Sequence, residues 1–499
     1  MFADDARTHW SKAYQVCLSD NIGFDSQFNT DNSCGLTPKE AIMDEYREVL
    51  ERAHQMGQAY MADIATRRVA PDAEALAGLS AFDQALPAGP GNPVETLELL
   101  NRAGGPATIA SSGARYFGFV TGGILPAAAG ANWLAGAWDQ LAFNETSSPT
   151  SIKLETVAGR WILELLGLPA GSTVSFVTGS TMAHFTCLAA ARAEMLRRQG
   201  YDLKAKGLRG APPLRIIVSG EIHVTVHKVL GMLGFGADEV EVVPADDQGR
   251  MRADLLPQLD SRCIVICQAG NVNSGAFDPF EAICGAAKAA GAWVHVDGAF
   301  GLWGRVTPSL DAQTAGIHHA DSWTVDSHKW LNTPMDCGLA VCRDPEAVRR
   351  VMSTDAAYIR TGAALAPKDI TPEFGRRARG VEVWAALHSL GREGVRDLIE
   401  RCCAHARRFA EGLRAMGFDV LNDVVLNQVV ATIGGPGDIA KVMAHVQASG
   451  ECWFGPTHWQ GRDAVRISVA SWRTTEADVD RSLTAIERAV RDVVAKVSA

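Results

Sequence analysis

Residues 322–334 read SWTVDSHKWLNTP. The run 322–326 has the length and apolar character of a buried strand, and Pro334 ends the segment in a turn. Lys329 lies between them, although burying an ammonium group costs much free energy. A lysine after a buried strand either extends its amine to solvent or uses that amine in chemistry, so the rest of the chain has to decide between the two roles.

Strand-length apolar runs alternate with helical stretches through the middle of the chain. The runs lie at residues 174–177, 214–219, 240–243, 263–268, 292–297, 322–326 and 338–342. This alternation, with β-branched residues in the runs, predicts an α/β fold with a mostly parallel, seven-stranded sheet covered on both faces. Ligands of such sheets bind at the carboxyl ends of the strands.

The regions that flank the predicted sheet differ from it and from each other. Residues 1–104 are polar and helical, with too few core residues to fold alone. After residue 385, helices alternate with short strands, and residues 476–497 have the pattern of an amphipathic helix. We therefore expect an N-terminal helical segment (1–104), a large domain (105–385) and a smaller C-terminal α/β domain (386–499).

Composition and charge exclude several kinds of partner. The 499 residues carry a net charge of −10 without a long basic run, so nucleic acid is not expected. The N-terminal residues lack the pattern of a secretory signal. The longest apolar run, 124–142, contains a proline, glycines and an aspartate, which predicts a buried helix rather than a membrane span. The 11 scattered cysteines without a C-x-x-C pair indicate reduced thiols in a cytoplasmic protein.

Two candidate sites follow the first two strands. In residues 177–181, VTGST, the hydroxyls of Ser180 and Thr181 and the amides after them could hold an anion at a helix N-terminus, although ordinary helix caps use the same residues. His223 follows the second strand and could stack on a flat ligand. His227 lies one helical turn later, but the sequence offers no third ligand nearby, so a metal site is not expected.

A third candidate site is the strand end at residues 295–299, HVDGA. Asp297 shares a strand face with His295 and Trp293 by alternation. A buried carboxylate needs a partner, unless Asp297 only caps the next helix. The small side chains after it, including Ala299, let another group approach closely.

The candidate sites together describe one ligand with an anionic tail, a flat ring, a basic ring nitrogen and an electrophilic carbon. The anionic tail would face Ser180 and Thr181, and the flat ring would lie between His223 and Ala299. The ring nitrogen would face Asp297, and the electrophilic carbon would face Lys329. Pyridoxal 5'-phosphate has these parts, because its aldehyde forms a Schiff base with a lysine and its protonated ring nitrogen pairs with a carboxylate.

The order of the motifs resembles that of the group II pyridoxal phosphate-dependent amino acid decarboxylases, of fold type I in the aspartate aminotransferase superfamily. The resemblance rests on the hydroxyl-rich turn, the histidine, HVDGA and SHKW, and runs from about residue 113 to 384. It implies that Lys329 forms the Schiff base and that Asp297 pairs with the ring nitrogen. It places His223 and Ala299 on the two faces of the ring.

The same resemblance assigns the remaining cofactor contacts and the activity. Ser180, Thr181 and His328 would lie at the phosphate, while Asn271 and Asn273 would lie near the ring hydroxyl and the substrate carboxylate. The implied reaction is decarboxylation of an L-amino acid in a homodimer whose N-terminal helices clasp the partner. An aromatic or other bulky substrate is favoured by the apolar side chains of Tyr116, Phe117, Phe119 and Trp330.

The chain departs from the family pattern at two places. Residues 359–375 correspond to a mobile loop that usually carries a protonating tyrosine, but they contain none, and Tyr358 is the candidate replacement. Residues 113–114 are Gly-Ala, where His-Pro is common. A carbon–carbon lyase or an aldehyde-forming oxidative deaminase therefore stays open, and a non-catalytic cofactor-binding protein is the least expected alternative. After the loop, Arg376, Arg377 and Arg379 could anchor a carboxylate, contact a partner or lie in solvent.

Overall fold

The computed structural model describes residues 38–354 and 366–493. Tyr358 and residues 359–365 of the predicted loop at 359–375 lie outside the described residues. The described chain divides into two units: residues 38–58 with 88–98, and all the others. The first unit contains most of α2 (Pro38–Asp63) and of α4 (Pro93–Leu99), which are joined by an ion pair between Arg52 and Glu98 at 2.8 Å.

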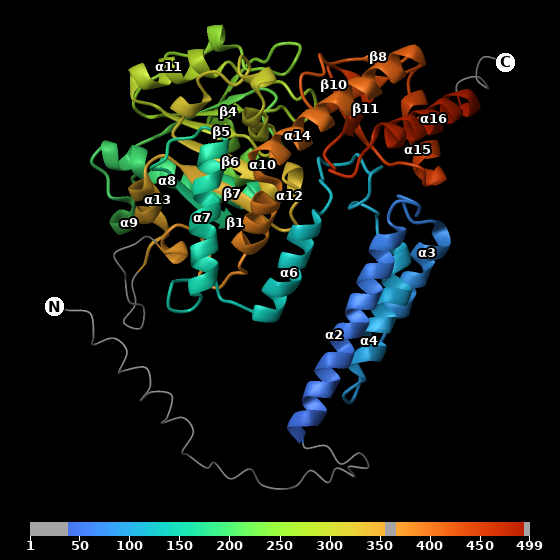
Figure 1. The fold of residues 1–499 in the computed structure, drawn as a ribbon. Helices are drawn as coiled ribbons and strands as arrows, with labels where there is room; N and C mark the ends of the chain where they lie inside the picture. Colours follow the sequence, from blue (N-terminus) through green and yellow to red (C-terminus); the bar gives the residue numbers. More distant parts are fainter. Residues whose placement is uncertain (1–37, 355–365, 494–499) are drawn as a thin grey trace, which may run out of the picture. The chain divides into compact units, whose positions relative to one another are not determined.

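A seven-stranded sheet forms the centre of the second unit (Figure 1). Its strands are β1 (Thr173–Val177), β2 (Arg215–Ser219), β3 (Val240–Val243), β4 (Cys263–Gln268), β5 (Trp293–Asp297), β6 (Ser322–Asp326) and β7 (Gly338–Cys342). They lie in the order β1-β7-β6-β5-β4-β2-β3, and β7 is the strand that runs antiparallel to its neighbours. All seven predicted strands are confirmed to within one residue at each end.

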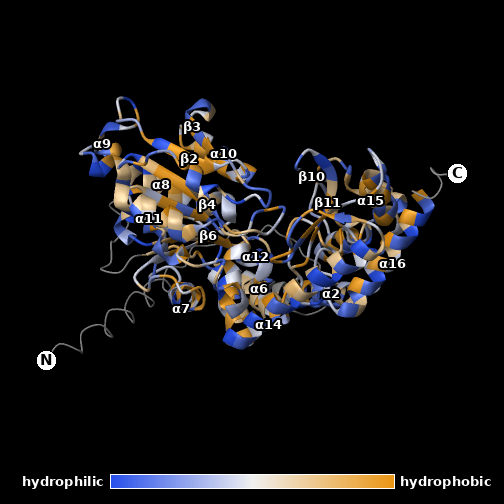
Figure 2. Ribbon diagram, turned by 90° about the horizontal axis from the view of Figure 1, so that it is seen from above, coloured by the Kyte–Doolittle hydropathy of each residue, from blue (hydrophilic) through white to orange (hydrophobic). Residues whose placement is uncertain are grey.

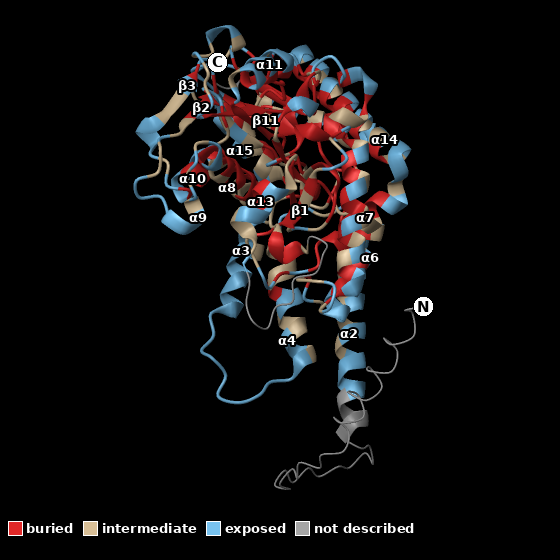
Figure 3. Ribbon diagram, turned by 90° about the vertical axis from the view of Figure 1, so that its left-hand side faces the viewer, coloured by how far each residue is buried: buried red, intermediate tan, exposed pale blue. Residues whose placement is uncertain are grey.

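Helices cover both faces of this sheet. The larger ones are α7 (Pro149–Leu165), α8 (Ser180–Arg198), α10 (Val224–Met232), α11 (Phe280–Ala290) and α13 (Pro345–Met352). Alternate residues of the strands enter two separate apolar clusters, one with α11 and one with α8 and α10. The central strands are therefore mostly hydrophobic (Figure 2) and buried along their whole length (Figure 3).

A second, antiparallel sheet follows near the C-terminus. It contains β8 (Asp419–Val420), β9 (Gln428–Thr432), β10 (Gly455–Trp459) and β11 (Arg462–Ser468), in the order β10-β11-β9-β8. It packs against α15 (Asp438–Ser449), which in turn packs against α16 (Glu476–Val493). The long helix α14 (Gly380–Ala415) contacts α7 as well as β8 and β9 of this sheet (Figure 1). Short helices complete the unit: α3 (Ala73–Gly78), α5 (Gly105–Ala107), α9 (Leu203–Lys206) and α12 (Ser327–Trp330).

Helix α6 (Pro126–Trp138) corrects one prediction. Ala131 and Ala135 are buried where the helix packs against α14, but Trp133, Leu134 and Trp138 are exposed. The prediction of a buried helix is therefore wrong for one face, because an apolar sequence does not say what covers each side. Among the described helices, none combines the length and the apolar character that crossing a membrane requires.

Candidate active site

A pocket of about 460 Å³ lies at the carboxyl ends of the strands β1, β2, β4, β5 and β6. The edge is shared because these strands run in the same direction. Seven of the predicted site residues line the pocket: Ser180, Thr181, His223, Asp297, Ala299, His328 and Lys329.

One end of the pocket is suited to an anion. Ser180 and Thr181 begin the 19-residue helix α8, whose first amides and dipole favour negative charge. A Cβ atom at position 179 would lie 3.3 Å from the Cε1 atom of His328, so glycine keeps open the space between this helix end and the His328 ring. A phosphate group fits this part of the pocket.

Asp297 provides a buried negative charge in the same pocket. Its Oδ1 accepts a hydrogen bond from the Ala299 amide at 3.1 Å, and its Oδ2 lies 3.4 Å from Nε2 of His184. Burial alone would raise the pKa of Asp297, but His184, followed by His223 and Lys329, outweighs that effect and holds the pKa below its ordinary value. An ionised, buried carboxylate that faces a cavity fits a ligand with a protonated ring nitrogen.

His223 presents a neutral imidazole. It caps α10, and its Nδ1 atom lies 2.7 Å from the hydroxyl of Thr225, which also lines the pocket. Burial, the largest influence, lowers the pKa of His223, while Asp297 acts in the opposite direction. A neutral, half-buried ring is suited to stacking on a flat ligand.

Lys329 does not extend its amine to solvent. Its side chain is 21% exposed, and its Nζ atom lies 3.0 Å from Oδ2 of Asp326 inside the pocket. The same carboxylate accepts a hydrogen bond from Ser180 and lies 3.8 Å from Nε2 of His328. The other Asp326 oxygen, Oδ1, is buried and has no hydrogen-bond partner among the described residues. The geometry therefore favours the chemical role for Lys329.

The sequence analysis missed three polar residues of this region: Asp326, His184 and Arg466. Asp326 precedes Lys329 by three residues, and His184 follows Ser180 by four, so helical spacing from the predicted residues could have found both. Arg466 comes from β11 of the second sheet, and its guanidinium donates to the Val272 carbonyl at 3.1 Å. Burial lowers the pKa of Arg466. No local signal links it to Lys329.

The structure does not bring the side chains of Asn271 and Asn273 into the pocket. The Asn271 side chain accepts from the Asn273 amide at 2.9 Å, and Asn273 accepts from the Thr457 hydroxyl at 2.6 Å. Both residues thus stabilise a turn, and the neighbouring residues 270 and 272 line the pocket instead. Their assignment as cofactor contacts therefore finds no support in the pocket lining.

Three other predicted features also have structural roles. Arg376 is buried with Glu155 at 2.8 Å, Arg377 pairs with Glu382, and Arg379 pairs with Asp336 at 3.0 Å. Each arginine of the cluster therefore already has a carboxylate partner.

Within the described ranges, no group of three or more His, Cys, Asp or Glu side chains could hold a metal ion.

The predicted apolar wall is smaller than expected. Trp330 and Phe117 are fully buried in the core, and Tyr116 stacks on Trp453 with ring centroids 5.1 Å apart. Of the four predicted aromatic residues, Phe119 lines the pocket, and it is 65% exposed there. Met335, which is also exposed, lies on the same lining.

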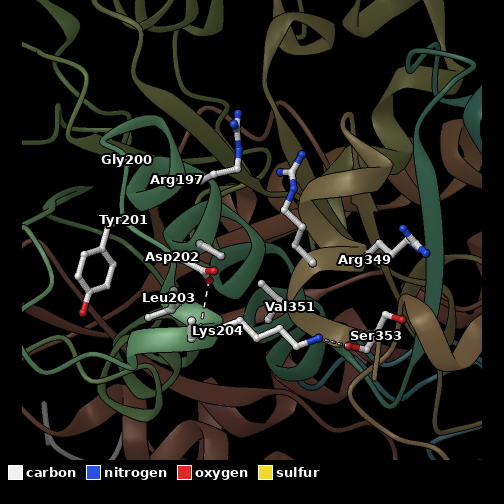
Figure 4. Close-up of a pocket in the computed structure, with 12 residues that line it drawn as sticks. Arg197, Gly200, Tyr201, Asp202, Leu203, Lys204, Arg349, Val351 and Ser353 are labelled. Carbon is white, nitrogen blue, oxygen red and sulfur yellow. Dashed lines mark hydrogen bonds between the residues drawn. The ribbon is translucent and has the colours of Figure 1, made fainter. Parts of the chain in front are cut away.

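A larger cavity, of about 800 Å³, lies at the other end of α8 (Figure 4). Arg197 and Arg350 of its lining both bind Glu194, at 2.8 and 2.5 Å. Lys204 extends toward Ser353 and donates to its carbonyl at 2.9 Å. None of the predicted site residues that the structure describes lines this cavity, and its cations are already engaged, so the smaller pocket is the candidate active site.

Comparison with known proteins agrees with this geometry. The family model described as "Pyridoxal-dependent decarboxylase conserved domain" matches residues 115–433. Tryptophan decarboxylase 1 of Oryza sativa subsp. japonica is 25% identical over 398 residues, which are 71% of this chain and 76% of that protein. L-2,4-diaminobutyrate decarboxylase of Rhizobium meliloti is 28% identical over 383 residues, 72% of each chain. Phenylacetaldehyde synthase of a Rosa hybrid cultivar is 28% identical over 311 residues, 58% of this chain and 60% of that protein.

Solved structures show the same fold. The crystal structure of Oryza sativa TDC with PLP and tryptamine superimposes with a TM-score of 0.82 at 22% identity, covering 92% of this chain and 99% of that one. The crystal structure of mouse CSAD gives a TM-score of 0.82 at 22% identity, with coverages of 91% and 99%. The predicted α/β architecture with its helical N-terminal part is confirmed.

Proposed function

Since the chain belongs to the pyridoxal-dependent decarboxylase family and is a pyridoxal phosphate-dependent carboxy-lyase, we propose that the pocket around Lys329 holds the cofactor and decarboxylates an L-amino acid. The observation that carries this proposal is the meeting of Lys329, Asp297 and His223 in one pocket, although they are far apart in the sequence.

The residues present fit pyridoxal 5'-phosphate at each of its parts. Ser180, Thr181 and His328 would hold the phosphate, and His223 and Ala299 the two faces of the ring. When bound, the cofactor supplies an electron sink for a bond that breaks at the substrate α-carbon.

The protein's own groups prepare that chemistry. Asp297 keeps a negative charge beside the place of the ring nitrogen, and so holds a proton there. Lys329 supplies the primary amine to which the cofactor attaches, and Asp326 positions that amine at 3.0 Å. Arg466 places a positive charge at the pocket for the carboxylate of the substrate.

We propose an aromatic or other bulky amino acid as the substrate. The support is the apolar lining by Phe119 and Met335, together with relatives whose names specify tryptophan, tyrosine and DOPA. Other relatives act on diaminobutyrate and cysteine sulfinic acid, so a panel of substrates has to be measured.

An aldehyde-forming reaction is the second candidate. Residues 359–375 contain no tyrosine, Tyr358 is the proposed replacement, and phenylacetaldehyde and 4-hydroxyphenylacetaldehyde synthases are among the relatives. Decarboxylation releases an amine and CO₂, whereas the oxidative reaction would also consume O₂ and water and would release an aldehyde, ammonia and hydrogen peroxide together with CO₂.

The proposed assembly is a cytoplasmic homodimer with the three parts 1–104, 105–385 and 386–499. Exposed Trp133, Leu134 and Trp138 on α6 give the dimer an apolar surface to bury. Nine cysteines of the described ranges are free and buried, as in a reducing compartment. Light scattering on the purified full chain tests the dimer: a monomer at micromolar concentration would contradict it.

The proposed activity is tested by absorption spectroscopy and product analysis. Wild-type protein reconstituted with pyridoxal phosphate should show a near-visible band that borohydride removes and that Lys329→Ala lacks. A panel of L-amino acids then identifies the amine or the aldehyde. A wild-type protein without this band would contradict cofactor attachment at Lys329.

A further inference from the structure

A row of buried polar side chains lies behind Asp297. Its members are Trp293, His295, Ser322, Thr324 and His184, each no more than 1% exposed. They have no direct part in the function proposed above, and burying so many polar groups is costly unless each finds a partner.

The row forms because three elements meet on one face of the sheet. Alternation along β5 places Trp293, His295 and Asp297 on the same side. The parallel register sets His295 beside Ser322 of β6. Helix α8 packs on this part of the sheet, and His184 lies one turn after Ser180, so the two side chains lie on the same face of the helix.

Short distances connect the row from Trp293 to Asp297. Trp293 Nε1 lies 3.0 Å from the Ser322 hydroxyl, which lies 2.8 Å from His295 Nδ1. His295 Nε2 lies 2.9 Å from His184 Nδ1. The other His184 nitrogen, Nε2, lies 3.4 Å from Asp297 Oδ2 and has no hydrogen-bond partner among the described residues.

The chemistry of the end groups gives the row a direction. An indole N–H can only donate, so the Ser322 hydroxyl accepts a hydrogen bond from Trp293 and can donate one to His295 Nδ1. His295 then carries its proton on Nε2 and donates to His184 Nδ1. The Thr324 hydroxyl, 3.2 Å from that same Nδ1, can donate to it as well. His184 is left with its proton on Nε2, facing the carboxylate.

We infer that His184 is a positioning residue for Asp297: the donor row from Trp293 fixes the His184 tautomer whose Nε2–H faces the carboxylate and keeps it ionised. The inference rests on the proposed function, since Asp297 matters to catalysis through the cofactor nitrogen. Burial lowers the pKa of His295 well below its usual range, so the hydrogen bond that His295 donates comes from a neutral ring. The charged or titratable groups that face Asp297 are His184 of α8, His223 before α10 and Lys329 of α12.

The first test needs no cofactor and no activity. In cofactor-free protein labelled with ¹⁵N-histidine, we expect His184 and His295 both to carry a single proton, on Nε2. Trp293→Phe removes the donor at the far end, and we expect His295 to become a mixture of tautomers. A wild-type His184 that is protonated on Nδ1, or on both nitrogens, would overturn the inference. This outcome is independent of whether the proposed reaction occurs.

The second test separates positioning from folding. In reconstituted enzyme, His184→Leu should lower kcat by about ten- to hundredfold, as losing the partner of a metal ligand does. His184→Gln, which keeps an amide N–H, should recover most of that loss. A cofactor methylated on its ring nitrogen carries a permanent charge, so it should narrow the gap between His184→Leu and wild type. The control is His445→Leu on α15, which should behave as wild type. Full kcat in His184→Leu, or no gain from the methylated cofactor, would overturn the inference. If His184→Leu does not fold, the Trp293→Phe measurements decide.

Discussion

Helix α8 has a pocket at each end, and the two pockets balance their charges differently. At its N-terminus, the buried carboxylates of Asp297 and Asp326 face a cavity together with Lys329. At its C-terminus, Arg197 and Arg350 share the carboxylate of Glu194, and all the cations of that pocket are partly exposed. The pocket at the C-terminus of α8 has the larger volume, whereas the pocket at the N-terminus has the buried carboxylates that face open space.

This difference shows that cavity size does not locate chemistry. The C-terminal arginines complement the helix dipole and a neighbouring acid, so no ligand is needed to complete them. In the N-terminal pocket, a buried Asp326 oxygen has no partner among the described residues, and the ionised Asp297 faces open space. Matched substitutions at the two ends of α8 can therefore test whether the two pockets differ in this way.

The largest effect is expected for Lys329→Ala. It removes the amine that attaches the cofactor, so kcat should fall to about one thousandth or less. The matched control is Lys204→Ala in the other pocket, where the amine donates to a carbonyl, and its kcat should stay at the wild-type value. Steady-state assays on both variants make the measurement. An active Lys329→Ala enzyme would show that the amine in the N-terminal pocket is not needed for the reaction.

Asp297→Asn should give the next largest loss. The substitution keeps the shape and removes the charge beside the ring nitrogen, so kcat should fall by about a hundredfold or more. Asp202→Asn is the control, because this carboxylate lines the other pocket, where it caps the short helix α9. Equal kcat values for the two variants would show that the buried charge has no special role.

Arg466→Met should affect binding more than turnover. Loss of a charged hydrogen-bond donor costs about 1.5–3 kcal/mol, which corresponds to about a ten- to hundredfold rise in KM. Arg349→Met in the other cavity should leave KM unchanged. If Arg466→Met lowers kcat and leaves KM at its wild-type value, the proposed contact with the substrate carboxylate is wrong.

Glu194→Gln should affect stability and not activity. Hydrogen bonding from Arg197, followed by Arg198, lowers the pKa of Glu194 to about 2. Because this pKa lies below that of the unfolded chain, the carboxylate stabilises the fold above about pH 4, and the contribution disappears as the pH falls toward 2. At pH 7 we expect the variant to lose about 1 kcal/mol of unfolding free energy.

Denaturant titrations of wild type and Glu194→Gln at pH 7 and pH 4 check this expectation. The difference between the two proteins should be smaller at the lower pH. A difference that grows as the pH falls would mean that Glu194 does not act as the shared partner of the arginines.

The sequence predicted the parts of this molecule that depend on local pattern. The buried strands stand out because apolar, β-branched runs need a sheet covered on both faces, and HVDGA and SHKW follow directly from two of them. His184 and Arg466 could not be assigned in the same way. His184 acquires its role from the register between β5 and β6, and Arg466 from the packing of the second sheet. The sequence does not show that the Asn271 side chain accepts a hydrogen bond within its turn, because this bond is visible only in three dimensions.

The place of Arg466 in the second sheet has a consequence for protein synthesis. A ribosome adds about 5–20 residues per second, so Lys329 leaves it on the order of ten seconds before Arg466 does. During that interval the strands β1 to β7 are already made, while β11 is not. Translation therefore supplies the residues of the proposed cofactor site first and the proposed substrate contact of Arg466 last, and a chain truncated before β11 has the former without the latter.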